Sequence, residues 1–250
     1  MFMRVLSSKS GPHVYPELAG ARVLITGLMS TTGVDVARAF AEHKARLVLQ
    51  SPQSSPEITA VAALLAEAAA EIKLFNDAVT SADDAVRFAQ TPAQAYGGLD
   101  AVINLVTIDP TDLAGRESVA EIEEFVSSRL ASALFITRVA ANRMRLTWTE
   151  GSILNVVIMP APANSREASV ADVVRATVAA ITRAEASEWA QCAIRINAVG
   201  PRSSVSESKS GACLTCEADV AALALYLAGK NGRRLSGHVF DAEGCAVRRC

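Results

Sequence analysis

The sequence predicts a single α/β domain in which helices cover both faces of a doubly wound parallel sheet. From residue 21 onward, short apolar runs alternate with longer amphipathic stretches, and half of the residues are hydrophobic while only 5% are aromatic. Strands buried on both faces are aliphatic, and strand–helix alternation implies right-handed crossovers between parallel strands. A chain of 250 residues is within the range of one large domain.

The individual elements follow from the length and periodicity of each apolar run. Strands are expected at residues 21–26, 46–50, 72–75, 100–104, 152–159, 193–199 and 237–244. Helices are expected at residues 33–44, 57–70, 119–144, 170–190 and 217–229. No Pro/Gly-rich linker or internal repeat divides the chain, so residues 19–250 form one domain, preceded by a loosely attached extension, residues 1–18.

Composition excludes several classes of function. The 24 basic and 26 acidic residues give a net charge of -2, so neither nucleic acid nor an anionic membrane is an expected partner. The chain has no apolar run long enough to span a membrane and no signal peptide, which favours a cytoplasmic protein. Its five cysteines do not suggest a disulfide framework. No metal site is predicted, because Cys213 and Cys216 lack further ligands and the three histidines lack ligand spacing.

The first predicted strand ends in the sequence TGLMSTTG, residues 26–33, which opens directly into a predicted helix. Gly27 and Gly33 permit a tight turn, and the helix N-terminus offers free N–H groups to a pyrophosphate. From the residues alone, the segment is either a dinucleotide-binding loop or a strand–helix turn without a ligand. The residues between the glycines add the hydroxyl groups of Ser30, Thr31 and Thr32.

Further motifs lie along the chain: NDAV with Asp77, LDAVINLVT with Asn104, AIRINAVGP with Pro201, and LSGHVFDAEG. Together with the glycine loop, they resemble the short-chain dehydrogenase/reductase family, and the resemblance runs from about residue 21 to 245. The family's loop pattern TGxxxGIG aligns without gaps, but Thr31 stands at its middle glycine and Thr32 follows. The resemblance implies a Rossmann fold.

The resemblance also implies a dinucleotide, either NAD or NADP. The position that binds the cofactor ribose in the family is Ser51, which is neither acidic nor basic, so the sequence does not choose between the two. The residues that the resemblance assigns to the cofactor are Gly27, Ser30, Thr31, Thr32, Gly33, Ser51, Asp77, Asn104, Arg175 and Pro201.

Enzymes of the family move a proton with a Tyr, a Lys four residues later, a Ser about thirteen residues earlier and an Asn on the preceding helix. The chain has tyrosines only at positions 15, 96 and 226, and no lysine between Lys73 and Lys209. Alignment therefore predicts no catalytic residue. It places Ala171, Arg175, Ile158 and Arg129 at the Tyr, Lys, Ser and Asn positions.

Three functional hypotheses follow. The first is a pseudoenzyme that acts as a binding or regulatory subunit, with or without NAD(P). The alternative is an NAD(P)-dependent oxidoreductase of altered or slow mechanism, and a third is a cofactor-free enzyme that uses the same pocket. Family members commonly associate through the two long helices and the last strand. A homo-oligomer, dimer or tetramer, or a subunit paired with an active relative is therefore expected.

Overall fold

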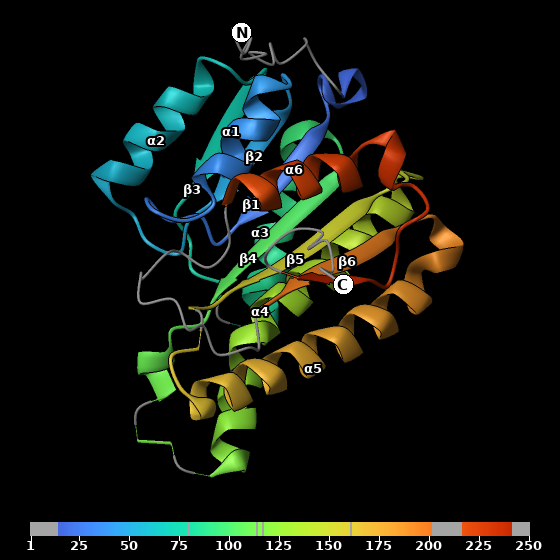
Figure 1. The fold of residues 1–250 in the computed structure, drawn as a ribbon. Helices are drawn as coiled ribbons and strands as arrows, with labels where there is room; N and C mark the ends of the chain where they lie inside the picture. Colours follow the sequence, from blue (N-terminus) through green and yellow to red (C-terminus); the bar gives the residue numbers. More distant parts are fainter. Residues whose placement is uncertain are drawn as a thin grey trace, which may run out of the picture.

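The computed structural model describes residues 15–79, 81–113, 115–116, 118–160, 162–201 and 217–241. These residues contain one sheet of seven parallel strands in the order β3-β2-β1-β4-β5-β6-β7 (Figure 1). The predicted doubly wound α/β class is confirmed. The strands are β1 (Arg22–Thr26), β2 (Arg46–Gln50), β3 (Glu71–Phe75), β4 (Ala101–Thr107), β5 (Ser152–Ile158), β6 (Arg195–Gly200) and β7 (Val239–Asp241).

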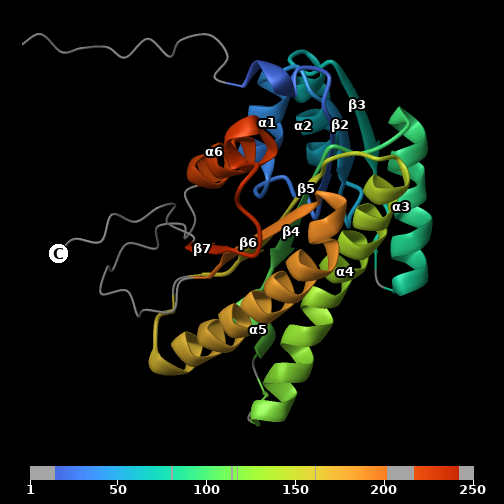
Figure 2. The same cartoon turned by 90° about the vertical axis from the view of Figure 1, so that its right-hand side faces the viewer.

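Helices pack on both faces of the sheet, as Figure 2 shows from the side. One face carries α1 (Val34–Glu42), α2 (Pro56–Ala66) and α6 (Glu217–Ala228). The other carries α3 (Ala82–Tyr96), α4 (Val119–Leu146) and α5 (Ser165–Trp189). Successive strand residues point to opposite faces, so Val23 and Ile25 of β1 pack under α1 while Leu24 packs with the α3 and α4 side.

Helix α3 is the one long helix of the described residues that the apolar pattern does not predict. Its sequence is polar and contains Pro92, which normally disfavours a helix interior. A capping box starts it: the Ser81 hydroxyl accepts from the Asp84 N–H, and the Asp84 carboxylate accepts from the Ser81 N–H, both at 3.1 Å. Phe88, buried against the sheet, supplies part of its attachment.

The start of one helix also differs from the predicted one. Helix α5 begins at Ser165 rather than near residue 170, because the Asn164 side chain caps it by accepting from the Glu167 N–H at 2.9 Å. At the other end of the chain, Leu18 is buried and Glu17 accepts from the Lys230 N–H at 2.8 Å. Residues 15–18 thus pack on the domain, while residues 1–14 lie outside the described residues. The boundary at residue 19 stays a prediction.

Among the helices that the structure describes, none combines the length and the apolar character that crossing a membrane requires.

Candidate functional site

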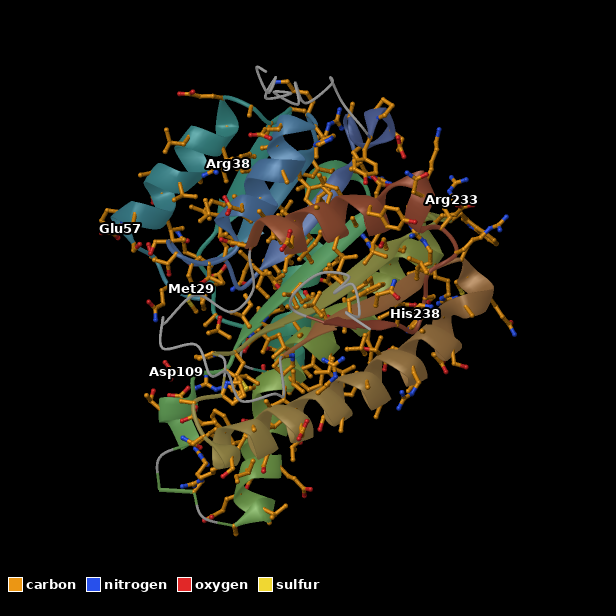
Figure 3. All side chains as sticks on the ribbon, in the orientation of Figure 1. Met29, Arg38, Glu57, Asp109, Arg233 and His238 are labelled. Carbon is orange, nitrogen blue, oxygen red and sulfur yellow. The ribbon has the colours of Figure 1, made fainter. Side chains whose placement is uncertain are left out.

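The carboxyl ends of β1, β2 and β4 enclose a cleft of about 530 Å³. The chain proceeds outward from β1 through β2 to β3 and then returns to β4 on the other side of β1, so the strand order reverses at this point. Ligands of open α/β sheets bind at such a reversal. Figure 3 labels Met29 and Asp109 at this edge and Arg233 at the opposite edge. The cleft is lined by Thr26, Gly27, Met29, Gln50, Pro52, Val79, Leu105, Val106, Thr107, Arg116, Phe125, Ser128, Arg129, Ser132, Ala133 and Ile136.

The glycine loop, residues 27–33, packs directly on β4. Gly27 has φ +73° and Gly33 has φ +86°, both in the left-handed region. A Cβ atom on Gly27 would lie 2.1 Å from the Leu105 carbonyl oxygen, and one on Gly33 would lie 2.2 Å from Leu105 Cδ1. At Gly27 the contact is with backbone, so no side chain fits there, whereas at Gly33 the left-handed φ is what favours glycine.

Between the two glycines, the loop closes on itself. The Met29 N–H donates to the Thr32 carbonyl at 3.0 Å, and the Thr32 N–H donates to the Met29 carbonyl at 3.3 Å. Ser30 and Thr31 form the exposed tip of this turn. The Thr32 N–H is therefore occupied within the loop, and the next backbone N–H groups along the chain are those at the start of α1.

At the end of β2, Gln50 provides the polar side chain in the cleft. Its Oε1 accepts from the Gly27 N–H at 2.8 Å, and its Nε2 donates to the Asp77 carbonyl at 2.7 Å. Ser51, the predicted ribose-binding residue, is buried and bonds to its own loop, donating to the Gln53 carbonyl at 2.7 Å. The Asp77 side chain is exposed. The structure thus places Gln50, not Ser51, on the wall of the cleft.

Asn104 lies beneath the cleft and not in it. Its side chain is fully buried, with Oδ1 accepting from the Thr26 hydroxyl at 2.9 Å. Its Nδ2 donates to Asn155 Oδ1 at 2.8 Å and to the Thr137 hydroxyl at 3.1 Å. These contacts join β1, β4, β5 and α4. Each of these bonds turns the Asn104 side chain toward the interior of the domain.

Thr107, at the end of β4, is, like Gln50, a residue of the cleft that sequence reasoning missed. Its hydroxyl is buried and has no hydrogen-bond partner in the structure. An unsatisfied buried hydroxyl is unfavourable, and a ligand group in the cleft could satisfy it. The only signal in the sequence was the change from the family's glycine to Thr at this position.

One end of the cleft is positively charged. Arg116 and Arg129 stack on the Phe125 ring, with guanidinium carbons 4.8 and 5.2 Å from its centroid. Arg129, at the position of the family's Asn, also forms an ion pair with Asp112.

The residues at the remaining catalytic positions lie where β5 and β6 end. Ala171 is fully buried in an apolar cluster with Val106, and Ile158 is half-buried at the end of β5. Arg175 is half-buried and turned inward, with its guanidinium donating to the Pro201 carbonyl at 3.2 Å.

Two predictions concern metals and cysteines. The pair Cys213 and Cys216 lies outside the described residues. Within the described ranges, no three His, Cys, Asp or Glu side chains gather into a group that could hold a metal ion.

Comparison with known proteins identifies the family. The family model for short chain dehydrogenase matches residues 21–210. The chain belongs to the short chain dehydrogenase family. The glycine loop, Asn104 and Pro201 all lie within the matched residues.

Individual dehydrogenases align over nearly the whole chain. Borneol dehydrogenase, mitochondrial, of Lavandula x intermedia is 27% identical over 246 residues, which cover 92% of each chain. Galactitol 2-dehydrogenase (L-tagatose-forming) of Cereibacter sphaeroides is 28% identical over 255 residues, covering 91% of this chain and 95% of that protein. The crystal structure of NADH-dependent reductase A1-R' complexed with NAD superposes with a TM-score of 0.71 at 22% identity, covering 90% of this chain and 96% of the other.

Proposed function

We propose that this chain binds NAD or NADP in the cleft at the ends of β1, β2 and β4, and that it is an oxidoreductase whose mechanism departs from the family's Ser-Tyr-Lys proton relay. The observation that carries the proposal is the cleft itself. It lies at the strand-order reversal, beside a loop whose Gly27 admits no side chain, in a chain that matches the family model over residues 21–210.

The cleft residues fit a dinucleotide in two respects. Gly27 lets the loop backbone pack closely on β4, which holds the loop at the cleft, and the unpaired Thr107 hydroxyl offers a buried hydrogen-bonding group. A bound nicotinamide supplies hydride transfer. Arg175 brings a positive charge to the end of β6, where it would hold the ribose side of the cofactor. It is not a base, because arginine stays protonated in proteins.

Proton transfer is where the mechanism differs. Ala171 and Ile158 carry no ionisable group, so neither can transfer the proton, and we propose that water or a group of the substrate supplies it. Each missing acid–base group lowers the rate by about 10² to 10⁴. Tyr96 does not replace the family's Tyr: its hydroxyl donates to the Leu47 carbonyl on α3's side of the sheet, and burial raises its pKa to about 12. The proposed reaction is therefore slow by the standards of the family.

A second candidate is a subunit that does not catalyse, the pseudoenzyme. It is favoured by the absence of any lysine between Lys73 and Lys209 and of any tyrosine between Tyr96 and Tyr226. Under either candidate, we propose association with a second copy, or with an active relative, through the long helices α4 and α5. Multi-angle light scattering measures the state of the purified chain, and co-purification with tagged relatives tests the second arrangement.

The deciding experiment is calorimetric titration with NADH and NADPH. Single-turnover assays then follow the reduced cofactor with aldehydes and ketones, and NAD⁺ or NADP⁺ with alcohols. Binding with slow hydride transfer supports the oxidoreductase, whereas binding without any transfer supports the non-catalytic subunit. Absence of binding at millimolar cofactor refutes both forms of the proposal that include a dinucleotide.

A matched pair of variants ties the binding to the cleft. Thr107→Val removes the unpaired hydroxyl with little change of shape and should weaken binding by roughly 2- to 12-fold, the range for one hydrogen bond. Thr59→Val makes the same change on the exposed surface of α2 and should leave binding unchanged. If Thr107→Val and Thr59→Val bind the dinucleotide with equal affinity, the cofactor does not contact Thr107.

A further inference from the structure

The N-terminus of α1 has no cap of its own. The helix begins after Gly33, and its N-cap residue makes no side-chain hydrogen bond. The first N–H groups of a helix lack partners within the helix, and the aligned peptide dipoles make this end attractive to an anion. In a dinucleotide-binding fold, this is the end that faces the pyrophosphate.

A carboxylate from a distant part of the chain faces this helix end. Glu217 is the first residue of α6, which packs beside α1 in both ribbon views (Figures 1 and 2). Its side chain is half-buried and lies near the backbone N–H groups of Gly33, Val34 and Asp35, which act on its pKa. Its Oε1 atom is buried and has no hydrogen-bond partner among the described residues.

The surroundings of Glu217 disfavour the ionised form of its carboxylate. Burial raises the pKa of Glu217 and the nearby Asp35 carboxylate raises it further, and the three backbone N–H groups only partly oppose this. Asp35 itself pairs with Arg38 at 3.0 Å. A group whose charged form is disfavoured in the folded state is not a cap that stabilises the fold at neutral pH. When it is ionised, Glu217 nevertheless places a negative charge at the N-terminus of α1, where the negative charge of a bound pyrophosphate would lie.

We propose that the Glu217 carboxylate occupies the anion position at the α1 N-terminus and lowers the affinity of the chain for NAD and NADP by competing with the pyrophosphate. This inference rests on the proposed function, since it concerns the same cofactor. Binding then requires the Glu217 side chain to move away or to accept a proton.

The test compares the wild type with Glu217→Gln, which keeps the size of the side chain and removes its charge. Calorimetric titration at pH 8 should show NADH or NADPH binding tighter to Glu217→Gln by about 5- to 30-fold, the range for an anion at a partly buried helix N-terminus. Asp219→Asn removes an exposed charge from the same turn of α6 and should bind as the wild type does. Glu217→Ala repeats the comparison if the Gln variant does not fold.

A titration with NAD⁺ at decreasing pH provides a second readout. Protonation of Glu217 should tighten NAD⁺ binding to the wild type. The difference in NAD⁺ affinity between the wild type and Glu217→Gln should therefore become smaller as the pH falls. Equal affinity of wild type and Glu217→Gln at pH 8, with a lower melting temperature in the variant, overturns the inference and makes Glu217 a structural cap. If neither the wild type nor any variant binds a dinucleotide, the proposed function is overturned as well. This result differs from equal affinities, which overturn only the role of Glu217.

Discussion

Replacing Asn104 by alanine should remove the polar junction that holds β1, β4, β5 and α4 in register. The wild-type side chain accepts from the Thr26 hydroxyl at 2.9 Å and donates to Asn155 at 2.8 Å and to Thr137 at 3.1 Å. In the variant, the fully buried Thr26 hydroxyl has lost its acceptor and Asn155 keeps only the bond from Thr137 at 3.1 Å. One orphaned group and two lost bonds together amount to about 3–5 kcal/mol.

That loss is a large part of the stability of a domain, about 5–15 kcal/mol. It corresponds to a fall of roughly 6–20 °C in melting temperature at this chain length. Urea unfolding followed by circular dichroism measures the free energy of unfolding. Asn142→Ala is the matched control, because Asn142 is exposed on α4 and bonds only to Arg145 among the described residues. It should change the free energy by less than about 0.5 kcal/mol.

A double-mutant cycle decides whether the network itself is responsible. Asn104→Ala and Asn155→Ala should show a coupling energy of about 0.5–3 kcal/mol, because the two side chains share a bond. Additive effects, or a loss in Asn104→Ala no greater than in Asn142→Ala, would refute the reasoning that this buried network fixes α4 on the sheet.

Two further predictions concern the loop and the opposite edge of the sheet. Gly27→Ala should destabilise the chain by about 3 kcal/mol or more and abolish dinucleotide binding, because its Cβ would lie 2.1 Å from the Leu105 carbonyl. Gly20→Ala, with a similar φ of +76° and open space around it, should cost only the backbone strain of about 1–2 kcal/mol, and equal losses in urea unfolding would contradict the clash. Burial would raise the pKa of Asp100, but hydrogen bonds from Arg22 hold that pKa below its usual value. Its ionised form therefore stabilises the fold above the usual pKa, and this contribution disappears as the pH falls through the lowered one. Asp100→Asn should lose about 1 kcal/mol at pH 7, with a smaller difference from wild type at pH 3; an unchanged difference would show that Arg22 does not hold the carboxylate.

The fold was predictable because its strands carry a strong local signal. Residues 23–25 of β1 and 156–158 of β5 are consecutive aliphatic residues, a pattern typical of strands that are buried on both faces. Helix α3 was not predictable from apolar periodicity, since tertiary contacts of residues such as Phe88 and the cap at Ser81 offset the polar character of its sequence.

The place of the site was predictable, but not the direction of each side chain. Neighbouring strand residues point to opposite faces, so a motif match fixes a position in the strand but not whether its side chain faces the cleft. At the end of β2 the side chain in the cleft is Gln50, whereas Ser51 bonds within its loop. In β4, Leu105 supports the glycine loop while Asn104 turns to α4.

A motif also does not reveal whether its donors are free. The resemblance assigns the N–H groups of the loop and of the α1 N-terminus to a pyrophosphate, but every buried donor seeks a partner, and a protein side chain can be that partner. Here Gln50 accepts from the Gly27 N–H at 2.8 Å, and the Glu217 carboxylate faces the start of α1. Both side chains come from outside the loop. If they must be displaced before a dinucleotide binds, the chain should hold its cofactor more weakly than a relative whose loop donors are free, and charge removal at Glu217 should recover part of that difference.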